Sequence, residues 1–127
     1  MAEVKVVQTT DAPAAIGPYS QGRFAGPFLF VSGQLPINPL SGQMDEAIAD
    51  QTHRSLKNLK AIVESAGGTL ESVVKTTVFL KDMNDFARVN EVYRQYFKEN
   101  YPTRSAIEVA HLPKDAKVEI EAIAYIG

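Results

Sequence analysis

The clearest alternation of apolar and polar positions in this sequence lies near its C-terminus, between residues 117 and 126. One set of alternate residues is apolar, and the set between them begins with charged side chains: Val118, Ile120, Ala122, Ala124 and Ile126 against Lys117, Glu119 and Glu121. A period of two is typical of a strand that turns one face to a core. Residues 104–110 alternate in the same way, and the turn-forming stretch 112–115 separates the two segments. We therefore expect two strands here, with Arg104 and the two glutamates on faces that are not apolar.

Further upstream, the pattern predicts four more strands and two helices. The strand candidates are rich in apolar and β-branched residues: 4–10, 21–24, 28–32 and 73–80. The helix candidates have apolar residues at helical spacing: a first helix over 45–66 that ends at Gly67-Gly68, and a second that begins after Asp82 or Asn84 and stops by Asn100. The order β, β, β, α, β, α, β, β predicts an α+β fold with two layers, in which two helices cover one face of one mixed sheet of about six strands.

The sheet of such a fold keeps one face uncovered, because two helices can cover only the other. The strand over 28–31 is apolar on both of its faces. The uncovered face would expose several large apolar side chains: Phe28, Phe30, Ile123 and Tyr125. A contiguous apolar patch of this kind usually marks an interface. The pattern therefore predicts that the chain assembles with other chains.

The composition is that of a single domain spanning residues 1–127, with a mass of 13.9 kDa. A net charge of −2 and a pI near 5.7 lack the basic footprint of a nucleic-acid-binding protein, so nucleic acid is not an expected partner. The sequence has no cysteine, which excludes disulfides and thiolate chemistry, and no spacing of His, Asp and Glu resembles a metal site. Residues 1–5 lack a signal-peptide pattern, and no apolar run approaches the ~18 residues of a membrane helix. We expect a cytoplasmic protein that contains no metal and spans no membrane.

Two charged residues of the predicted C-terminal strands are candidates for chemistry. The planar fork of Arg104 suits bidentate binding of a carboxylate, although an ordinary ion pair with Glu108 or Glu121 would also explain it. A carboxylate in the middle of a strand, such as Glu119, needs a partner, or its pKa rises. Glu119 could act as a base or orient a water molecule, or it could form a structural salt bridge with Lys117 or a neighbouring chain. Glu121 has an equal claim from the pattern alone.

Other candidates occupy loop or helix-edge positions. Tyr19 lies in a Gly-Pro loop, where it could line a pocket or tether the loop by packing. Ser32-Gly33 ends a predicted strand, and the glycine could let a ligand approach the backbone or simply form a turn. Asn90 lies on the polar edge of the second helix, where a solvated or helix-packing amide is the plainer interpretation.

Several of these residues belong to four separate stretches of the chain. They are Pro102-Thr103-Arg104-Ser105 with Leu112 and Val118-Glu119-Ile120; residues 12–21; Val31-Ser32-Gly33-Gln34; and residues 74–78 running into 84–86 and 89–90. These stretches resemble the reactive intermediate deaminase family, also called the Rid or YjgF-like family. The spacing from the arginine to the glutamate agrees with that family, and the resemblance covers nearly the whole chain.

The resemblance implies a chorismate-mutase-like fold that assembles as a homotrimer, with clefts between the subunits. It implies an enamine/imine deaminase that hydrolyses 2-aminoacrylate-type enamines and their 2-imino acid tautomers, such as 2-iminobutanoate and 2-iminopropanoate, to 2-keto acids and ammonia. No cofactor is implied. The expected small-molecule partner is therefore a 2-imino acid or the 2-keto acid formed from it.

The resemblance also assigns roles to single residues. Arg104 matches the arginine that holds the substrate carboxylate, and Glu119 matches the glutamate that orients or deprotonates water. The remaining candidates would bind or surround the substrate: Tyr19, Ser32, Gly33, Asn90 and Ala106. Ala106 stands where many relatives carry cysteine, but the family uses the backbone N–H at that position.

Three other functions remain open at this point, one of them a protein-stabilising, chaperone-like role that the sequence does not address. A non-catalytic trimer that binds a small carboxylate metabolite could use the same Arg104. Ribonuclease activity or translation inhibition is also ascribed to members of this family, although the acidic pI and the lack of a clustered histidine pair argue against it.

Overall fold

The computed structural model describes residues 4–127, so the first three residues of the N-terminal stretch considered above lie outside the described residues. Its strands are β1 (Val6–Val7), β2 (Gly22–Ala25), β3 (Phe28–Gln34), β4 (Val73–Leu80), β5 (Thr103–Glu108) and β6 (Val118–Tyr125). Its helices are α1 (Ile48–Ser65) and α2 (Phe86–Tyr96), with short 3₁₀ turns at Leu70–Ser72, Met83–Asp85 and Pro113–Asp115. The predicted order of strands and helices is confirmed.

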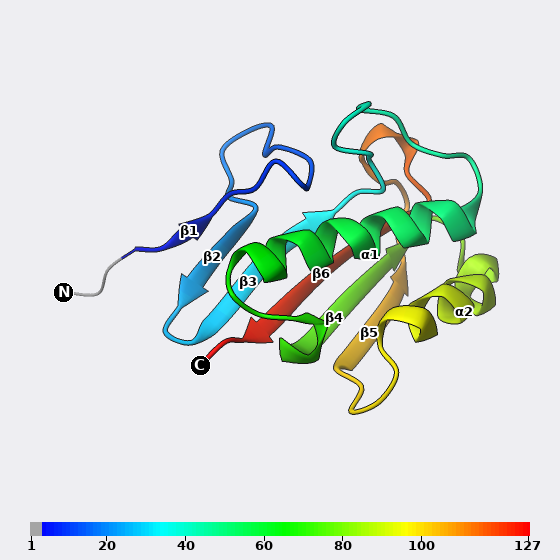
Figure 1. The fold of residues 1–127 in the computed structure, drawn as a ribbon. Coiled ribbons are helices and arrows are strands. Elements are labelled where there is room, and N and C mark those ends of the chain that lie inside the picture. The colour runs from blue at the N-terminus through cyan, green and yellow to red at the C-terminus, as the bar shows by residue number, and fades with distance from the viewer. Residues whose placement is uncertain (1–3) are drawn as a thin grey trace.

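The strands form one mixed sheet in the order β1-β2-β3-β6-β4-β5 (Figure 1). All neighbouring strands are antiparallel except β4 and β5, which are parallel. A parallel pair needs a crossover connection, which α2 supplies here. β4 therefore lies between β5 and β6, and the two C-terminal strands are not neighbours although they follow each other in sequence. The prediction of an α+β fold with one mixed sheet and two helices is confirmed.

Both helices lie on the same face of the sheet, where they enclose the core (Figure 1). The apolar stripe of α1 and the inward residues of the central strands are almost fully buried: Leu56, Leu59, Ile62, Leu29, Val31, Val78 and Ile120. On β6, the alternate residues from Val118 to Ala124 all belong to this core. The period-two pattern of the sequence therefore marks the helix-covered face of β6.

Over residues 4–127, the opposite face of the sheet carries no helix. Phe28, Phe30 and Tyr125 are 41%, 48% and 51% exposed there. The rings of Phe28 and Tyr125 meet edge to face, with their centroids 5.3 Å apart. The predicted exposure of an apolar patch on this face is confirmed for the isolated chain.

The predicted boundaries differ from the observed ones at several elements. Asp85 precedes α2, so neither Asp82 nor Asn84 caps this helix, and β5 is Thr103–Glu108 rather than residues 104–110. β1 is only Val6–Val7, because the Gln21 side chain forms the backbone hydrogen bonds of Thr9 that a longer strand would use. Gln21 Oε1 accepts from the Thr9 N–H at 2.7 Å, and Gln21 Nε2 donates to the Thr9 carbonyl at 3.0 Å. β3 continues through Gly33 to Gln34 instead of ending at residue 32. α1 begins at Ile48, three residues after the predicted start at Asp45.

Candidate functional site

A cavity of about 730 Å³ lies where β3 and β6 meet the loops around residues 13–19, 35–42 and 113–114. Four predicted site residues line it: Tyr19, Ser32, Gly33 and Glu119. Its wall is largely apolar, with Ile16, Leu35, Ile37 and Pro113, and its charged groups are Glu119, Glu121 and Lys114. A pocket of this size with an apolar wall and a few convergent polar groups is the usual form of a small-molecule site.

Glu119 lies against the backbone of Gly33 inside this cavity. A Cβ atom placed on Gly33 would collide with Oε2 of Glu119 and would lie 2.9 Å from its Cδ. The close approach is possible because β3 and β6 lose regular register between Val31 and Gln34, which leaves Gly33 in an irregular part of the ladder. The absence of a side chain at Gly33 therefore lets the Glu119 carboxylate take this position, whereas the sequence only indicated a strand end.

The environment of Glu119 favours its neutral form. Burial raises the pKa of the Glu119 carboxyl above its ordinary value, and the negative charge of Glu121 raises it further. Lys117, the predicted alternative partner, donates its Nζ to the Glu46 carbonyl at 2.6 Å instead. Within residues 4–127, no basic side chain lies within salt-bridge distance of Glu119. A carboxyl with a raised pKa in a cavity is a candidate for proton transfer.

Tyr19 and Ser32 shape the cavity through the loop that precedes β2. The Tyr19 side chain is half exposed, and its hydroxyl accepts a long hydrogen bond of 3.4 Å from the Ile16 N–H. The Ser32 hydroxyl donates to the Ser20 carbonyl at 2.6 Å. Both alternatives considered for Tyr19 thus apply, since it lines the cavity and also tethers its own loop.

Two buried amides hold the backbone around the cavity, and the sequence analysis missed both. Asn58 on α1 donates from Nδ2 to the carbonyls of Leu35 and Ile37 at 3.0 and 2.9 Å. Gln21 binds the segment from Thr9 to Pro13 through its side-chain amide. A weak signal for Asn58 was present in the sequence, because it lies between Leu56 and Leu59 of the apolar stripe, but the buried face of α1 also holds Gln51, Thr52 and Ser55.

The other charged candidate, Arg104, lies at the outer edge of the sheet on β5. Its Nη1 donates to Oδ1 of Asn90 on α2 at 2.7 Å. Its guanidinium carbon lies 5.2 Å from the ring centroid of Phe86 and 4.9 Å from that of Tyr93. The structure thus brings Arg104 and Asn90 together, although neither of them lines the cavity around Glu119.

The predicted face of Arg104 is wrong. Arg104 is the register partner of Thr76, which is buried under the helices, so Arg104 lies on the helix-covered side. Its side chain stays exposed because β5 is the last strand of the sheet and α2 only flanks it. The alternative interpretation, an ion pair with Glu108, is also wrong, since Glu108 accepts from the Met83 N–H at 2.8 Å. Among the residues that the structure describes, no carboxylate forms an ion pair with Arg104.

Ala106 presents its backbone at the same edge. The N–H of Val109 donates to the Leu80 carbonyl of β4 at 2.8 Å. Because backbone N–H groups alternate in direction along a strand, the N–H of Ala106 points away from β4, toward the free edge. A ligand beside Arg104 could therefore accept a hydrogen bond from this N–H.

One chain does not bring Arg104 and Glu119 together. Arg104 faces α2, while Glu119 faces away from the helices, since its neighbours Val118 and Ile120 are buried beneath them. Phe79 of β4 is the register partner of both Glu119 and Ile107. The Cα atoms of Arg104 and Glu119 are therefore two strand spacings apart across the sheet and three residues apart along the strand direction, which gives a separation of roughly 14 Å.

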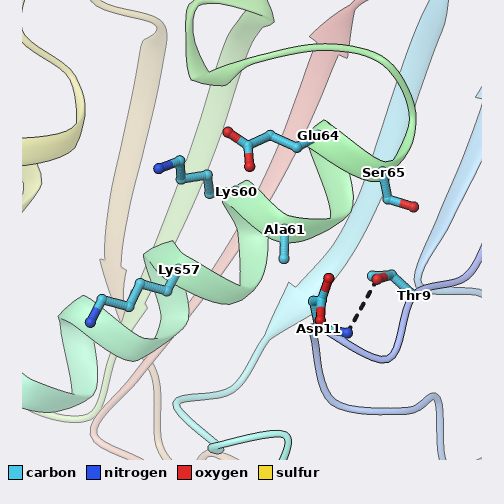
Figure 2. Close-up of a pocket in the computed structure, with 7 residues that line it drawn as sticks. All are labelled: Thr9, Asp11, Lys57, Lys60, Ala61, Glu64 and Ser65. Carbon is cyan, nitrogen blue, oxygen red and sulfur yellow. Dashed lines mark hydrogen bonds between the residues drawn. The ribbon is translucent and has the colours of Figure 1, made fainter.

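A different hollow, of about 510 Å³, lies between α1 and residues 9–11 (Figure 2). Figure 2 shows that the side chains of Lys57 and Lys60 extend away from Asp11, whose N–H donates to Thr9 Oγ1 at 3.2 Å. The charged groups of this hollow do not converge, and none of the predicted site residues lines it. We therefore place the candidate site at the Glu119 cavity and the Arg104 edge.

Residues 4–127 contain neither a cluster of metal ligands nor a helix that could span a membrane. No group of three or more His, Asp or Glu side chains in this range could hold a metal ion. No helix in the same range has the length and apolar character needed to cross a membrane.

Known proteins resemble this chain over almost its full length. A RutC family protein of Pyrococcus horikoshii is 57% identical over 122 residues, which are 95% of this chain and 97% of that protein. The 2-iminobutanoate/2-iminopropanoate deaminase of Escherichia coli K12 is 54% identical over 123 residues, covering 94% of this chain and 96% of that enzyme. The crystal structure of E. coli TdcF with bound serine superposes with a TM-score of 0.94 at 51% identity, covering 97% and 99% of the two chains.

The family assignment agrees with these relatives. The model of the family described as endoribonuclease L-PSP matches residues 9–126. This range contains both halves of the candidate site, from Tyr19 to Glu119. The chain therefore belongs to the endoribonuclease L-PSP family, which is the YjgF/Rid family of the resemblance seen in its sequence.

Proposed function

We propose that this protein hydrolyses the C=N bond of small 2-imino acids, 2-iminobutanoate and 2-iminopropanoate among them, to 2-keto acids and ammonia. The observation that carries the proposal is the Glu119 carboxyl, held against Gly33 in a cavity that raises its pKa. The name of the E. coli deaminase, at 54% identity, supports the same reaction.

The reaction needs little from the protein, because an imine is already electrophilic. Water adds to the imine carbon, the C–N bond of the resulting carbinolamine breaks, and ammonia leaves with a proton. Glu119 would orient the water or take its proton, and then return a proton to the leaving nitrogen. The same carboxyl, when protonated, could give a proton to the carbon of an enamine precursor. No cofactor takes part in these steps.

The other candidate residues would bind the substrate. Arg104 would take the carboxylate through its free N–H groups, and the Ala106 N–H at the same edge would add a donor. Gly33 would offer backbone groups beside Glu119. Tyr19 and Ser32 would form the wall of the cavity.

We propose further that the protein is a homotrimer whose active sites lie between subunits. Arg104 and Glu119 lie on opposite faces of one sheet, so a complete site needs the Arg104 edge of one subunit beside the Glu119 cavity of the next. The exposed Phe28, Phe30 and Tyr125 would be buried in such an assembly. Sedimentation should give a mass near three chains, and a stable monomer at micromolar concentration would contradict this arrangement.

A simple test of the function uses a threonine or serine dehydratase to release the imine in solution. Adding the purified protein should shorten the lifetime of the imine relative to buffer and to the Arg104→Ala variant. If the protein bound 2-keto acids without changing imine decay, it would be the non-catalytic carboxylate-binding trimer instead. The cytoplasmic location expected from the sequence stays a prediction.

A second candidate function is RNA cleavage, because the family description names an endoribonuclease. A net charge of −2 provides no long-range attraction for a polyanion, so RNA binding should be weak and should fall steeply with added salt. Cleavage of RNA that persists in high salt and copurifies with the protein through several columns would favour this candidate.

A further inference from the structure

A stripe of three residues on α2 lies against the Arg104 side chain. Phe86, Asn90 and Tyr93 follow one another at intervals of four and three residues, so they share one side of the helix. Arg104 reaches this stripe from β5, with its guanidinium carbon about 5 Å from both ring centroids and Nη1 bonded to Asn90. We call Phe86, Asn90 and Tyr93 the arginine cradle.

The aromatic part of the cradle is fixed from the core side. Tyr93 is 5% exposed, and its hydroxyl shares a 2.8 Å hydrogen bond with Oγ1 of the buried Thr76. Its ring also packs on Phe97, with 4.6 Å between the centroids. Burial raises the pKa of Tyr93, so the phenol stays neutral at physiological pH. The guanidinium therefore meets the fixed, neutral ring of Tyr93 and the ring of Phe86, and both attract a cation without pairing its charge.

The polar part of the cradle is an amide rather than a carboxylate. A guanidinium has five N–H donors, and Asn90 accepts from one of them, which leaves four for a ligand. An aspartate at position 90 would hold Arg104 more strongly, but it would also form an ion pair with the guanidinium that a substrate carboxylate needs to bind. Glu108, the acidic residue four positions along β5, is engaged with the Met83 N–H.

From this geometry we propose that the arginine cradle positions Arg104 while leaving its charge unpaired, and that the neutrality of Asn90 is the property that keeps the carboxylate site open. Asn90 is then a positioning residue that acts through Arg104. The inference rests on the proposed function, in which Arg104 binds the substrate carboxylate, and it changes the role that the sequence indicated for Asn90.

The decisive variant is Asn90→Asp, which keeps the shape of the side chain and adds a negative charge. Its melting temperature should equal or exceed that of the wild type, because a new ion pair with Arg104 forms. Its Kd for 2-oxobutanoate, measured by calorimetry, should rise about 10-fold or more, because the new carboxylate competes with the ligand for Arg104. KM for the imine should rise in parallel, with a smaller change in kcat.

The matched control is Gln95→Glu, which adds the same charge to an exposed position of the same helix. Gln95 donates only to the Glu91 carbonyl, at 3.5 Å, and does not touch Arg104. Its Kd for 2-oxobutanoate should stay close to that of the wild type. Equal weakening in Gln95→Glu and Asn90→Asp would reduce the effect to general charge repulsion and would overturn the proposal.

The aromatic contacts are tested separately, in case Asn90→Asp does not fold. Phe86→Leu keeps an apolar side chain but removes the ring face, and it should weaken 2-oxobutanoate binding several-fold. Phe86→Tyr keeps the face and should lose much less. If Phe86→Leu and Phe86→Tyr bind equally well, the ring does not position Arg104.

These results are distinguishable from a failure of the proposed function. In one outcome the wild-type protein turns over the imine, Arg104→Ala does not, and Asn90→Asp binds 2-oxobutanoate as tightly as the wild type. That outcome contradicts only the proposed role of the arginine cradle. If the wild type does not accelerate imine decay, the deaminase proposal falls, while the binding constants still decide whether the cradle keeps Arg104 open to carboxylates.

Discussion

The Glu119 carboxylate occupies the space that a side chain at Gly33 would need. Any Cβ at that position would collide with Oε2 and lie 3.2 Å from Cγ. Gly33→Ala should therefore push the carboxylate out of place and lower kcat by about 10-fold or more, since small displacements of a catalytic group are costly. The melting temperature should change little, because the colliding atoms are the end of a flexible side chain. Steady-state kinetics and thermal unfolding measure the two effects.

A double mutant separates this effect from an obstruction of the substrate. In a Glu119→Gln background the carboxylate is already lost as a base, so adding Gly33→Ala should cost much less activity than it does in the wild type. If the cost is the same in both backgrounds, the new methyl group acts on the substrate rather than on Glu119.

Glu119→Gln alone should lower kcat by ~10²–10⁴-fold if the carboxylate takes a proton from water. The amide keeps the shape of the side chain and can still hold a water molecule, so binding of a 2-keto acid should stay near that of the wild type. A loss well below 100-fold, with unchanged binding, would mean that Glu119 only orients the water. Both variants must keep the assembly state of the wild type for the comparison to hold.

The acid side of the pH profile should depend on Glu121. Activity that requires ionised Glu119 falls as the pH drops through its pKa, which burial and the Glu121 charge place above the ordinary value of 4.5. Glu121→Gln removes the like charge, so the Glu119 pKa should fall and the loss of activity should begin at a lower pH. The measurement is kcat/KM against pH, and an unmoved or upward-shifted acid limb would contradict the coupling.

The sequence predicts local structure well where packing follows a simple period. The alternation over 117–126 and the helical stripe over 45–66 both correspond to faces of one core. β1 is shorter than predicted because the side chain of Gln21, twelve residues after Thr9, forms the backbone hydrogen bonds of Thr9 in place of a neighbouring strand. The insertion of β4 between β5 and β6 is a long-range pairing that no local pattern encodes.

The sequence predicts candidate site residues one by one but not their arrangement. Glu119 and Gly33 are far apart in sequence, and only the irregular register of β3 against β6 brings them into contact. Asn90 looked like a solvated amide because its partner, Arg104, comes from a strand that follows in the chain. The separation of Arg104 from Glu119 follows from the register of β4 with both of its neighbours, a long-range pairing that no local pattern encodes.

Arg104→Ala should lower kcat/KM by roughly 30-fold to several thousand-fold, because losing one partner of a desolvated charge pair costs ~2–5 kcal/mol. Arg104→Lys should restore little, since an ammonium group lacks the planar fork that binds a carboxylate at two points. Imine hydrolysis kinetics on assembled protein give the values. An Arg104→Ala protein with unchanged kcat/KM would remove Arg104 from the site.

Mixing two inactive variants tests whether the site is shared between subunits. Arg104→Ala keeps the Glu119 cavity, and Glu119→Gln keeps the Arg104 edge. In a trimer with sites between neighbours, each mixed trimer contains one site that joins the two intact halves. Random assembly makes about three quarters of the trimers mixed, so about one quarter of all sites should be intact.

Coexpression of the two variants, or joint unfolding and refolding, should therefore restore about one quarter of the wild-type activity. The control is the same two proteins assembled separately and then combined, which should stay nearly inactive until subunits exchange. A site formed within one chain predicts a different result, because every chain in the mixture then carries a defective site. Mixed trimers that remain as inactive as their parents would contradict a site shared between subunits, because only a site in which Arg104 and Glu119 come from different chains can be restored by mixing.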